Sequence, residues 1–460
     1  MKIGIIGGGP AGYVAAIRGA QLGAEVVVIE KDNLGGTCTN WGCIPTKALF
    51  SITQKIHDFR WGNQKKMWEV ELPVNAIDWR MVMNFKNGVV ARLVKGIEFL
   101  FKKNRIMLVN GEAIVRSPNE IEVETAEGMK KYKFDRILLA TGSTSGFPPI
   151  DGLEGISPWD NIKALSADKL PQSLLILGGG VIGVEFANIF QSFGTQVTIV
   201  ELLPKILANQ DDEVSSAIHR ALVGEGVKIY TSSRAVKAHR SEQGVKLELD
   251  NDNVLTAEEI IVATGRKVIL PPGGEDIGLS IENNAVAVDE YRRTKLENVY
   301  AVGDITGEPH LAHKASHEGI VAVEHIMGMD SRFDPIAIPS AIFSALEVGT
   351  IGLTEKQARQ KYSRQGDIKV GKFPYIASGR AQAEGETVGF IKTIADPKGN
   401  IIGFHAVGKH SSELLALGGY LIQTGATISD VKDIIFAHPT LSEMLGESVL
   451  AADNSAIHIV

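Results

Sequence analysis

Cysteine is scarce in this sequence, because only Cys38 and Cys43 occur among its 460 residues. A fold held together by several disulfides is therefore excluded. Long apolar runs are also missing: nowhere do 18 apolar residues follow one another, which argues against a membrane-spanning helix. The opening stretch, MKIGIIGGGPAG, lacks the apolar core and the cleavage-like site of a secretory signal. We therefore expect a cytoplasmic protein with no membrane span.

Positive charge is in short supply as well. The formal net charge is −7 and the pI is near 5.9, which argues against general binding to nucleic acid or to an anionic membrane surface. Small molecules or proteins are the expected partners. Hydrophobic residues make up 44% of the chain and charged residues 22%. This is the composition of a globular protein, and its length predicts two to four domains.

The two cysteines lie in the segment GGTCTNWGCIPTK, residues 35–47. A regular helix would separate them by about 7.5 Å in axial rise alone, whereas a disulfide needs Cα atoms within roughly 7 Å. A bridge therefore requires a tight, irregular turn, in which Gly42 can relax the backbone. Pro45 suits the first turn of a helix, so we expect Cys43 at a helix N-terminus, where the helix dipole favours a thiolate. Lys47 would share the helical face of Cys43.

A structural role for this pair is the alternative to a redox role. A disulfide that closes so small a loop would stabilise the fold by only about 2 kcal/mol. Nothing in the sequence indicates secretion, so redox chemistry is favoured.

Two segments show the pattern of a dinucleotide-binding βαβ unit. In each, an apolar strand leads into a Gly-x-Gly-x-x-Gly turn, a helix and a second strand that ends in a glutamate 23 residues after the first glycine. The glycines allow a pyrophosphate to approach the helix N-terminus, and the glutamate can accept hydrogen bonds from a ribose diol. The two sets are Gly7, Gly9, Gly12 with Glu30, and Gly178, Gly180, Gly183 with Glu201. Two such units predict two dinucleotides.

Similar segments close both units, ILLATG at residues 137–142 and IIVATG at 260–265. Between the first unit and its closing segment we expect a helix over 84–104 and strands within 107–116 and 120–124, and we assign no element to 61–79. A strand over 299–304 ends in Asp304, which can hydrogen-bond a polyol chain. From residue 333 a third glycine pattern is missing. Short strands (341–343, 388–394, 401–407) alternate there with helices (354–362, 413–423), which predicts an α+β domain.

Histidines occur at two notable places. His310, His313 and His317 have the spacing of one helical face, but no cysteine or ligating carboxylate accompanies them, so we expect no metal site. His438 stands in AHPTLSEML, five residues before Glu443 at the start of a predicted last helix. A carboxylate this close can fix the tautomer of the imidazole and raise its basicity. The alternative is a capped helix start with an incidental histidine.

With both glycine turns, the cysteine segment, both ATG segments, YAVGD with LAHKA (300–315) and AHPTLSE (437–443), the chain resembles the pyridine nucleotide-disulfide oxidoreductases over nearly its whole length. Its motifs are most like those of the dihydrolipoamide dehydrogenases. The resemblance implies an α/β fold with an FAD-binding domain (1–143 and 263–332), an NAD-binding domain (144–262) and a C-terminal α+β dimerisation domain (333–460).

The family pattern also implies roles for individual residues. The implied catalytic residues are Cys38 as interchange thiol, Cys43 as flavin-contacting thiol, Lys47 paired with Glu185, and His438 with Glu443, supplied by the partner subunit of a homodimer. The implied FAD residues are Gly7, Gly9, Gly12, Glu30, Thr37, Lys47, Gly111, Ala140, Thr141, Gly142, Asp304 and Ala312. The implied NAD residues are Gly180, Gly183, Glu201 and Gly265.

The activity implied by the resemblance is transfer of electrons from dihydrolipoyl groups to NAD through the cysteine pair and FAD. NAD is favoured over NADP because no arginine occurs between residues 202 and 210. The implied partners are lipoyl groups on an acyltransferase or a glycine-cleavage carrier protein. Trp41, inside the redox segment, replaces a residue that is usually smaller in the family. The alternative is therefore an NADH-dependent reductase of another disulfide, a quinone or a metal ion.

Overall fold

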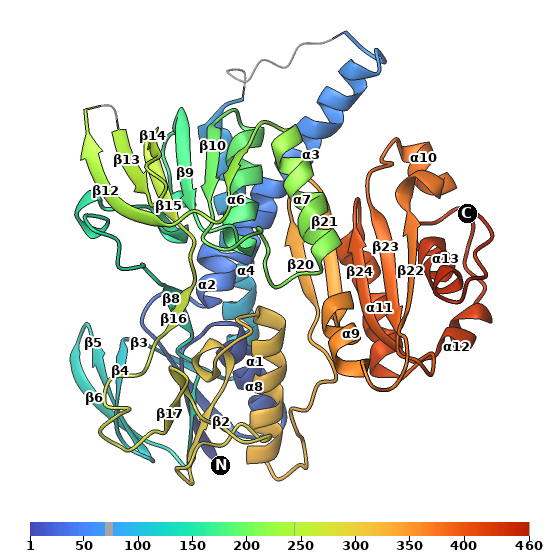
Figure 1. Ribbon diagram of the computed structural model, residues 1–460. Helices are drawn as coiled ribbons and strands as arrows, with labels where there is room; N and C mark the ends of the chain where they lie inside the picture. The colour runs from blue at the N-terminus through green and yellow to red at the C-terminus, as the bar shows by residue number, and fades with distance from the viewer. Residues whose placement is uncertain (70–76, 243, 460) are drawn as a thin grey trace.

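A computed structural model describes residues 1–69, 77–242 and 244–459 (Figure 1). It confirms the predicted class, with two α/β units and a C-terminal α+β domain. The first unit contains a parallel sheet in the order β19-β7-β1-β2-β3. These strands are β1 (Lys2–Ile6), β2 (Glu25–Glu30), β3 (Met107–Asn110), β7 (Arg136–Leu139) and β19 (Val299–Ala301). The sequences of β1 and β2, KIGII and EVVVIE, are almost wholly buried, as is typical of parallel strands covered on both faces.

Two helices pack together on this sheet, α1 (Pro10–Gln21) and α8 (Ala312–Ile326). Their approach is close, because a Cβ on Gly319 would lie 2.5 Å from the carbonyl oxygen of Ala11. Three antiparallel strands complete this part of the unit: β4 (Glu112–Ser117), β5 (Glu120–Thr125) and β6 (Gly128–Lys133).

The second unit repeats this construction. Its parallel sheet has the order β11-β10-β9-β15, and an antiparallel sheet, β12-β13-β14, is inserted in the chain between β11 and β15. The strands are β9 (Ser173–Leu177), β10 (Gln196–Val200), β11 (Lys228–Tyr230), β12 (Ala235–Ser241), β13 (Gly244–Leu249), β14 (Val254–Ala257) and β15 (Glu259–Val262). The helices are α6 (Val181–Ser192) and α7 (Asp212–Gly224).

The chain passes between the two units through a pair of short antiparallel strands. Strand β8 (Ser143–Ser145) leads out of the first unit, and β16 (Arg266–Val268), which pairs with it, leads back. Strand β19 then joins the first sheet. The first unit is thus built from two separate stretches of chain, and the domain boundaries given above stay a proposal.

The C-terminal domain, orange to red in Figure 1, is an antiparallel sheet in the order β20-β21-β24-β23-β22. Helix α11 packs on β21 and β24, and α13 packs on β22 and β23. The strands are β20 (Ser340–Phe343), β21 (Glu347–Gly352), β22 (Lys369–Pro374), β23 (Phe390–Ala395) and β24 (Ile401–Val407). The helices are α9 (Glu355–Tyr362), α10 (Gly379–Glu384), α11 (Ser411–Gln423), α12 (Ile428–Lys432) and α13 (Glu443–Ala452).

Several boundaries differ from the sequence prediction. The helix that begins at Cys43 continues to Gln64, into the stretch to which no element was assigned. Helix α4 (Trp79–Lys103) begins five residues before residue 84, because the carboxylate of Asp78 caps it by accepting a hydrogen bond from Met81 N at 3.2 Å. Of the unassigned stretch 61–79, the segment 70–76 lies outside the described residues. The sequence prediction also left out helix α7 and strands β6, β11 to β14, β21 and β22.

A buried lysine joins the C-terminal domain to the second unit. Lys392 on β23 has 2% of its side chain exposed. Its ammonium lies 3.0 Å from Asp211 Oδ1, 3.0 Å from Glu213 Oε2 and 2.7 Å from Glu355 Oε2. Burial opposes the positive charge, but hydrogen bonds to the three carboxylates outweigh this effect and raise the pKa of Lys392. Since Asp211 caps α7, this cluster ties two domains together.

Replacing Lys392 with methionine would leave the carboxylates without their shared cation. We expect the free energy of unfolding of the FAD-loaded protein to fall by about 3–5 kcal/mol, as measured by urea denaturation. The matched control is Lys398→Met, at an exposed turn, which should change stability by no more than about 0.5 kcal/mol. Equal stability of the two variants would contradict the role assigned to this cluster.

Candidate active site

The cysteine segment folds as two helices interrupted at one glycine. Helix α2 (Gly36–Trp41) ends at Gly42, and α3 (Cys43–Gln64) begins directly after it. The backbone is crowded here, because a Cβ on Gly42 would lie 3.0 Å from the carbonyl oxygen of Thr37 and 3.4 Å from the Cα of Cys38. Both cysteines are thiols in this structure. The break places Cys43 at the N-terminus of α3, where the helix dipole favours a thiolate.

The two thiols are hydrogen-bonded to each other and therefore differ in acidity. The hydrogen bond that Cys38 shares with Cys43, together with burial, raises the pKa of Cys38. The same hydrogen bond and the positive charge of Lys47 together lower the pKa of Cys43 to about 7, against the effect of burial. Near neutral pH the negative charge of this pair therefore sits on Cys43.

Lys47 is fixed by contacts with two other domains. Its ammonium donates to both carboxylate oxygens of Glu185 on α6, each at 2.8 Å. Phe343 at the end of β20 donates its backbone N–H to Glu185 Oε1 at 3.1 Å, and the ammonium lies 4.6 Å from the centre of the Phe343 ring. The sequence predicted the pair of Lys47 and Glu185 but not Phe343, which lies in a distant segment with no recognisable motif.

The two glycine turns have nearly identical geometry. Gly7 and Gly178 have φ values of 105° and 108°, which glycine adopts without strain. A Cβ on Gly12 would lie 1.8 Å from Gly7 O, and one on Gly183 would lie 2.0 Å from Gly178 O, so each third glycine lets its helix approach the turn. These two glycines lie beneath the turns.

Each turn is also held by the glutamate that ends the second strand. Glu30 accepts a hydrogen bond from Gly8 N, and Glu201 accepts one from Gly179 N, both at 2.6 Å. Both glutamates face the cavity described next.

A continuous cavity of about 1370 Å³ runs between the two units. Its volume exceeds the usual range of about 300–1,000 Å³ for ligand pockets. Most residues named from the sequence line it: Gly7, Gly9, Glu30, Thr37, Cys38, Cys43, Lys47, Gly111, Ala140, Thr141, Gly142, Gly180, Glu185, Glu201, Gly265, Asp304 and Ala312. With a glycine turn and a helix N-terminus at each half, these residues fit one dinucleotide on either side of the cysteines.

Asp304 belongs to a polar group that sequence reasoning did not find. Ser143 donates its hydroxyl to Asp304 Oδ2 and accepts a hydrogen bond from Arg266 Nε at 2.6 Å. The guanidinium of Arg266 also lies 3.7 Å from Asp304 Oδ2. Ser143 and Arg266 each directly follow an ATG segment, and this position in the sequence could have indicated that they lie at the site. This group holds the carboxylate of Asp304 at the cavity wall.

Trp41 ends α2 and lines the same cavity as Cys38. Its carbonyl oxygen accepts a hydrogen bond from Asn161 Nδ2 at 2.6 Å, and Ser145 donates to Asn161 Oδ1 at 2.8 Å. The indole is therefore attached to a backbone fixed by the second unit.

The His438–Glu443 pair forms but lies apart from the cysteines. His438 Nδ1 is 2.8 Å from Glu443 Oε1, and Thr440 N donates to Glu443 Oε2 at 2.7 Å. These hydrogen bonds outweigh burial and lower the pKa of Glu443. The imidazole is 78% exposed, and neither residue lines the cavity. Within one chain, then, the structure does not bring the cysteines and this pair together.

The three spaced histidines do not share a helical face. Helix α8 begins at Ala312, so His310 precedes it, and the predicted helical spacing is wrong for that residue. His313 Nε2 lies 2.8 Å from Pro339 O, and His317 stacks on Phe333 with ring centres 5.7 Å apart.

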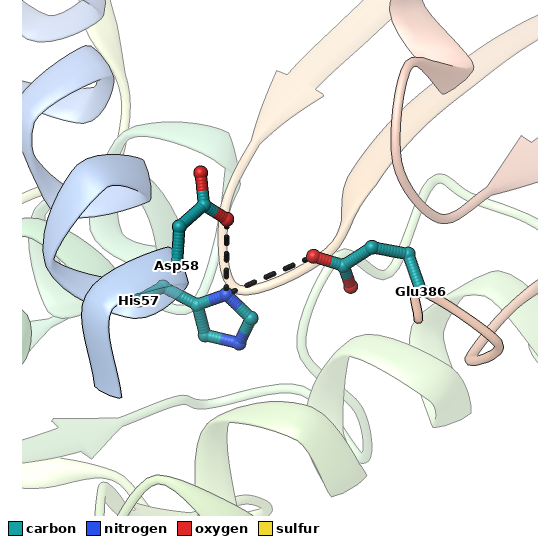
Figure 2. A group of neighbouring side chains, drawn as sticks. All are labelled: His57, Asp58 and Glu386. Carbon is teal, nitrogen blue, oxygen red and sulfur yellow. Dashed lines mark ion pairs between the residues drawn. The ribbon is translucent and has the colours of Figure 1, made fainter. Parts of the chain in front are cut away.

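Another group of potential metal ligands joins α3 to the C-terminal domain, as Figure 2 shows. His57 Nδ1 lies 3.9 Å from both Asp58 Oδ1 and Glu386 Oε1. The ammonium of Lys409 lies 3.8 Å and 3.4 Å from the same two oxygens. Since the ammonium of Lys409 already lies near both carboxylates and offsets one of their two negative charges, the group functions as an ion cluster between domains.

A thiol pair set between two dinucleotide-binding turns defines a flavin-linked disulfide oxidoreductase. Residues 1–319 match the sequence model of the family "Pyridine nucleotide-disulphide oxidoreductase", and residues 338–449 match the model of that family's dimerisation domain. The chain belongs to the pyridine nucleotide-disulphide oxidoreductases.

Similar proteins extend over the full length of the chain. A dihydrolipoyl dehydrogenase of Bacillus subtilis (strain 168) is 36% identical over 463 residues, which cover 100% of each chain. A dihydrolipoyl dehydrogenase of Haloferax volcanii is 37% identical over 467 residues, covering 99% of this chain and 96% of that one. Among solved structures, the HOCl-induced flavoprotein disulfide reductase RclA from Escherichia coli has a TM-score of 0.87 at 28% identity, covering 98% and 99% of the two chains.

The family and these relatives show that the protein is an FAD-dependent oxidoreductase that acts on disulfides and uses NAD(H). The match to the dimerisation domain indicates a homodimer. Among the helices of the described residues, none has both the length and the apolar character needed to cross a bilayer.

The acidity of Cys43 can be measured in the FAD-loaded Cys38→Ser variant, in which no disulfide can form. A Cys43 thiolate beside oxidised FAD should produce a long-wavelength absorption band. Because the thiolate is the form above the pKa, we expect the band to grow as the pH rises through about 7. Cys43→Ser should lack the band at every pH. A band that survives in Cys43→Ser, or that fades as the pH rises, would show that the thiols are assigned wrongly.

Proposed function

We propose that the protein oxidises dihydrolipoyl groups to lipoyl disulfide and passes the electrons to NAD. The observation that carries this proposal is the acidic Cys43 thiol, at a helix N-terminus in the cavity between the two dinucleotide turns. Dihydrolipoyl dehydrogenases at 36–37% identity over their full length support the choice of substrate.

We assign the first chemical steps to the cysteine pair in its disulfide form. A substrate thiolate attacks the sulfur of Cys38, and the bond between Cys38 and Cys43 breaks. Cys43 leaves as a thiolate, which suits the lower pKa of this thiol and the nearby charge of Lys47. The second substrate thiolate then attacks the mixed disulfide, and Cys38 leaves with the electron pair and takes up a proton, as suits its raised pKa.

FAD, when bound, supplies the two-electron connection between this dithiol and the nicotinamide of NAD. We assign FAD to the turn at Gly7–Gly12, and NAD to the turn at Gly178–Gly183. Glu201 would bind the ribose diol of NAD and repel the phosphate of NADP.

We assign the proton transfers to His438, with Glu443 orienting the imidazole. This base would take a proton from each substrate thiol in turn. Because His438 is exposed and neither residue lines the cavity of its own chain, we propose that each active site receives the pair from the second copy in the homodimer. The lipoyl group would arrive on an acyltransferase or on a glycine-cleavage carrier protein.

An NADH-dependent reductase of another disulfide, a quinone or a metal ion is the second candidate. Two observations favour it. Trp41, three residues after Cys38 on α2, lines the same cavity as Cys38, and the structurally similar RclA, at 28% identity, is a disulfide reductase.

Steady-state kinetics with a panel of substrates tests the proposal. We expect kcat/KM for dihydrolipoamide with NAD to exceed the values for NADH with other disulfides, quinones or Cu(II) by at least tenfold. We also expect NAD to be preferred over NADP by about 100-fold, because the carboxylate of Glu201 would lie next to the negatively charged phosphate of NADP. The control is Cys43→Ser, which should lose dihydrolipoamide oxidation while NADH still reduces artificial acceptors. A higher kcat/KM for another acceptor than for dihydrolipoamide would favour the second candidate.

A further inference from the structure

The carbonyl oxygen of Trp41 marks the break between α2 and α3. Trp41 is the last residue of α2, and the last carbonyls of a helix have no partner within that helix. The next carbonyl, that of Gly42, is taken up by α3, because Thr46 donates its backbone N–H to it at 3.1 Å and its hydroxyl at 2.8 Å. The carbonyl of Trp41 instead accepts a hydrogen bond at 2.6 Å from Asn161 Nδ2, 120 residues further along the chain. A side chain from a distant segment therefore completes the break.

Asn161 is itself held in one orientation. It is the first residue of helix α5, which spans Asn161–Ala164. Ser145 on β8 donates its hydroxyl to Asn161 Oδ1 at 2.8 Å, so the amide turns its oxygen to Ser145 and its N–H to Trp41. The segment just before α5 is attached to strand β15 of the second unit, because Trp159 forms a parallel β-bridge with that strand. The second unit thus presents a fixed N–H group to the thiol segment.

The thiol pair depends on the shape of this break. Cys43 is the second residue after Trp41, and the hydrogen bond that it shares with Cys38 spans the break. This hydrogen bond is the largest cause of the lowered pKa of Cys43. Backbone carbonyls keep a hydrogen-bond partner in folded proteins, so a carbonyl of Trp41 that lost the amide would turn to find another partner. The backbone between the two thiols would turn with it.

We propose that Asn161 is a positioning residue for the thiol pair. By holding the carbonyl of Trp41, it fixes the helix break and keeps Cys38 in hydrogen-bonding contact with Cys43. Asn161 acts through the backbone and takes no part in thiol exchange. A contact that only joined the two units would leave the acidity of Cys43 unchanged when it was lost, and this difference provides the test.

The inference adds a residue to the site of the proposed function, but it depends on neither dihydrolipoyl groups nor NAD. The acidity of Cys43 is measured without either molecule. The inference can therefore fail while the proposed reaction stands, and a different substrate would leave it intact.

The test uses the FAD-loaded Cys38→Ser variant, in which Cys43 is the one remaining cysteine of the chain and the introduced hydroxyl still donates to it. The rate of alkylation by iodoacetamide, followed by mass spectrometry over a range of pH, gives the pKa of Cys43, because the thiolate is the reactive form. Adding Asn161→Leu, which keeps the shape of the side chain but removes the donor, should raise this pKa by about 0.5–1 unit. The charged groups that interact with Cys43, namely Lys47, Glu185 and Arg266, are the same in both proteins.

Arg60→Met is the matched control. Arg60 lies toward the other end of α3 and donates to the carbonyl oxygen of Ser192 on α6 at 3.3 Å, so its loss removes another side-chain contact between the same two units. Added to Cys38→Ser, it should leave the pKa of Cys43 unchanged. An unchanged pKa with Asn161→Leu, or equal rises with Asn161→Leu and Arg60→Met, would overturn the proposal.

A second variant decides if Asn161→Leu does not retain FAD. Ser145→Ala keeps Asn161 but removes the hydroxyl that orients its amide. In the Cys38→Ser protein this change must also raise the pKa of Cys43, and a value that stays in place would equally overturn the proposal.

Discussion

Without the interruption of the helix at Gly42, the two thiols of this protein could not meet. A continuous helix would hold residues five positions apart at opposite ends of more than one turn. The break brings Cys38 against Cys43 and also makes Cys43 the first residue of a 22-residue helix. One glycine thereby produces both the contact and the difference in acidity between the thiols. Electron transfer through a dithiol depends on that difference, because one sulfur must leave as a thiolate while the other takes up a proton.

The ion pair of Lys47 with Glu185 extends this constraint to the whole molecule. Lys47 lies one turn after Cys43, Glu185 lies on α6 of the second unit, and Phe343 of the C-terminal domain binds the same carboxylate. Three domains thus meet at the carboxylate of Glu185. Displacing any one of them would change the charge felt by Cys43. The buried cluster around Lys392 provides a second connection between the second unit and the C-terminal domain, and its residues do not line the cavity.

Local features of this protein were predictable from the sequence, and contacts between distant segments were not. The glycine turns and the helix start at Cys43 are each encoded within a few consecutive residues, and the glutamates lie 23 residues after the first glycine of each turn, so spacing alone indicated them. The contacts of Ser143 with Arg266 join residues 123 positions apart in sequence, and no periodicity reports such a contact. His310 was assigned to a helical face because spacing alone does not reveal where a helix begins.

We propose that one active site draws on two chains, because the exposed His438 lies outside the cavity that holds the cysteines. The most direct test of this proposal is the activity of mixed dimers made by refolding Cys38→Ser and His438→Ala chains together in equal amounts with FAD. Each variant alone should be nearly inactive. A mixed dimer has one site with both intact cysteines and an intact histidine, so random pairing predicts about 25% of wild-type activity. No activity in mixed dimers verified by two different tags would contradict the shared site.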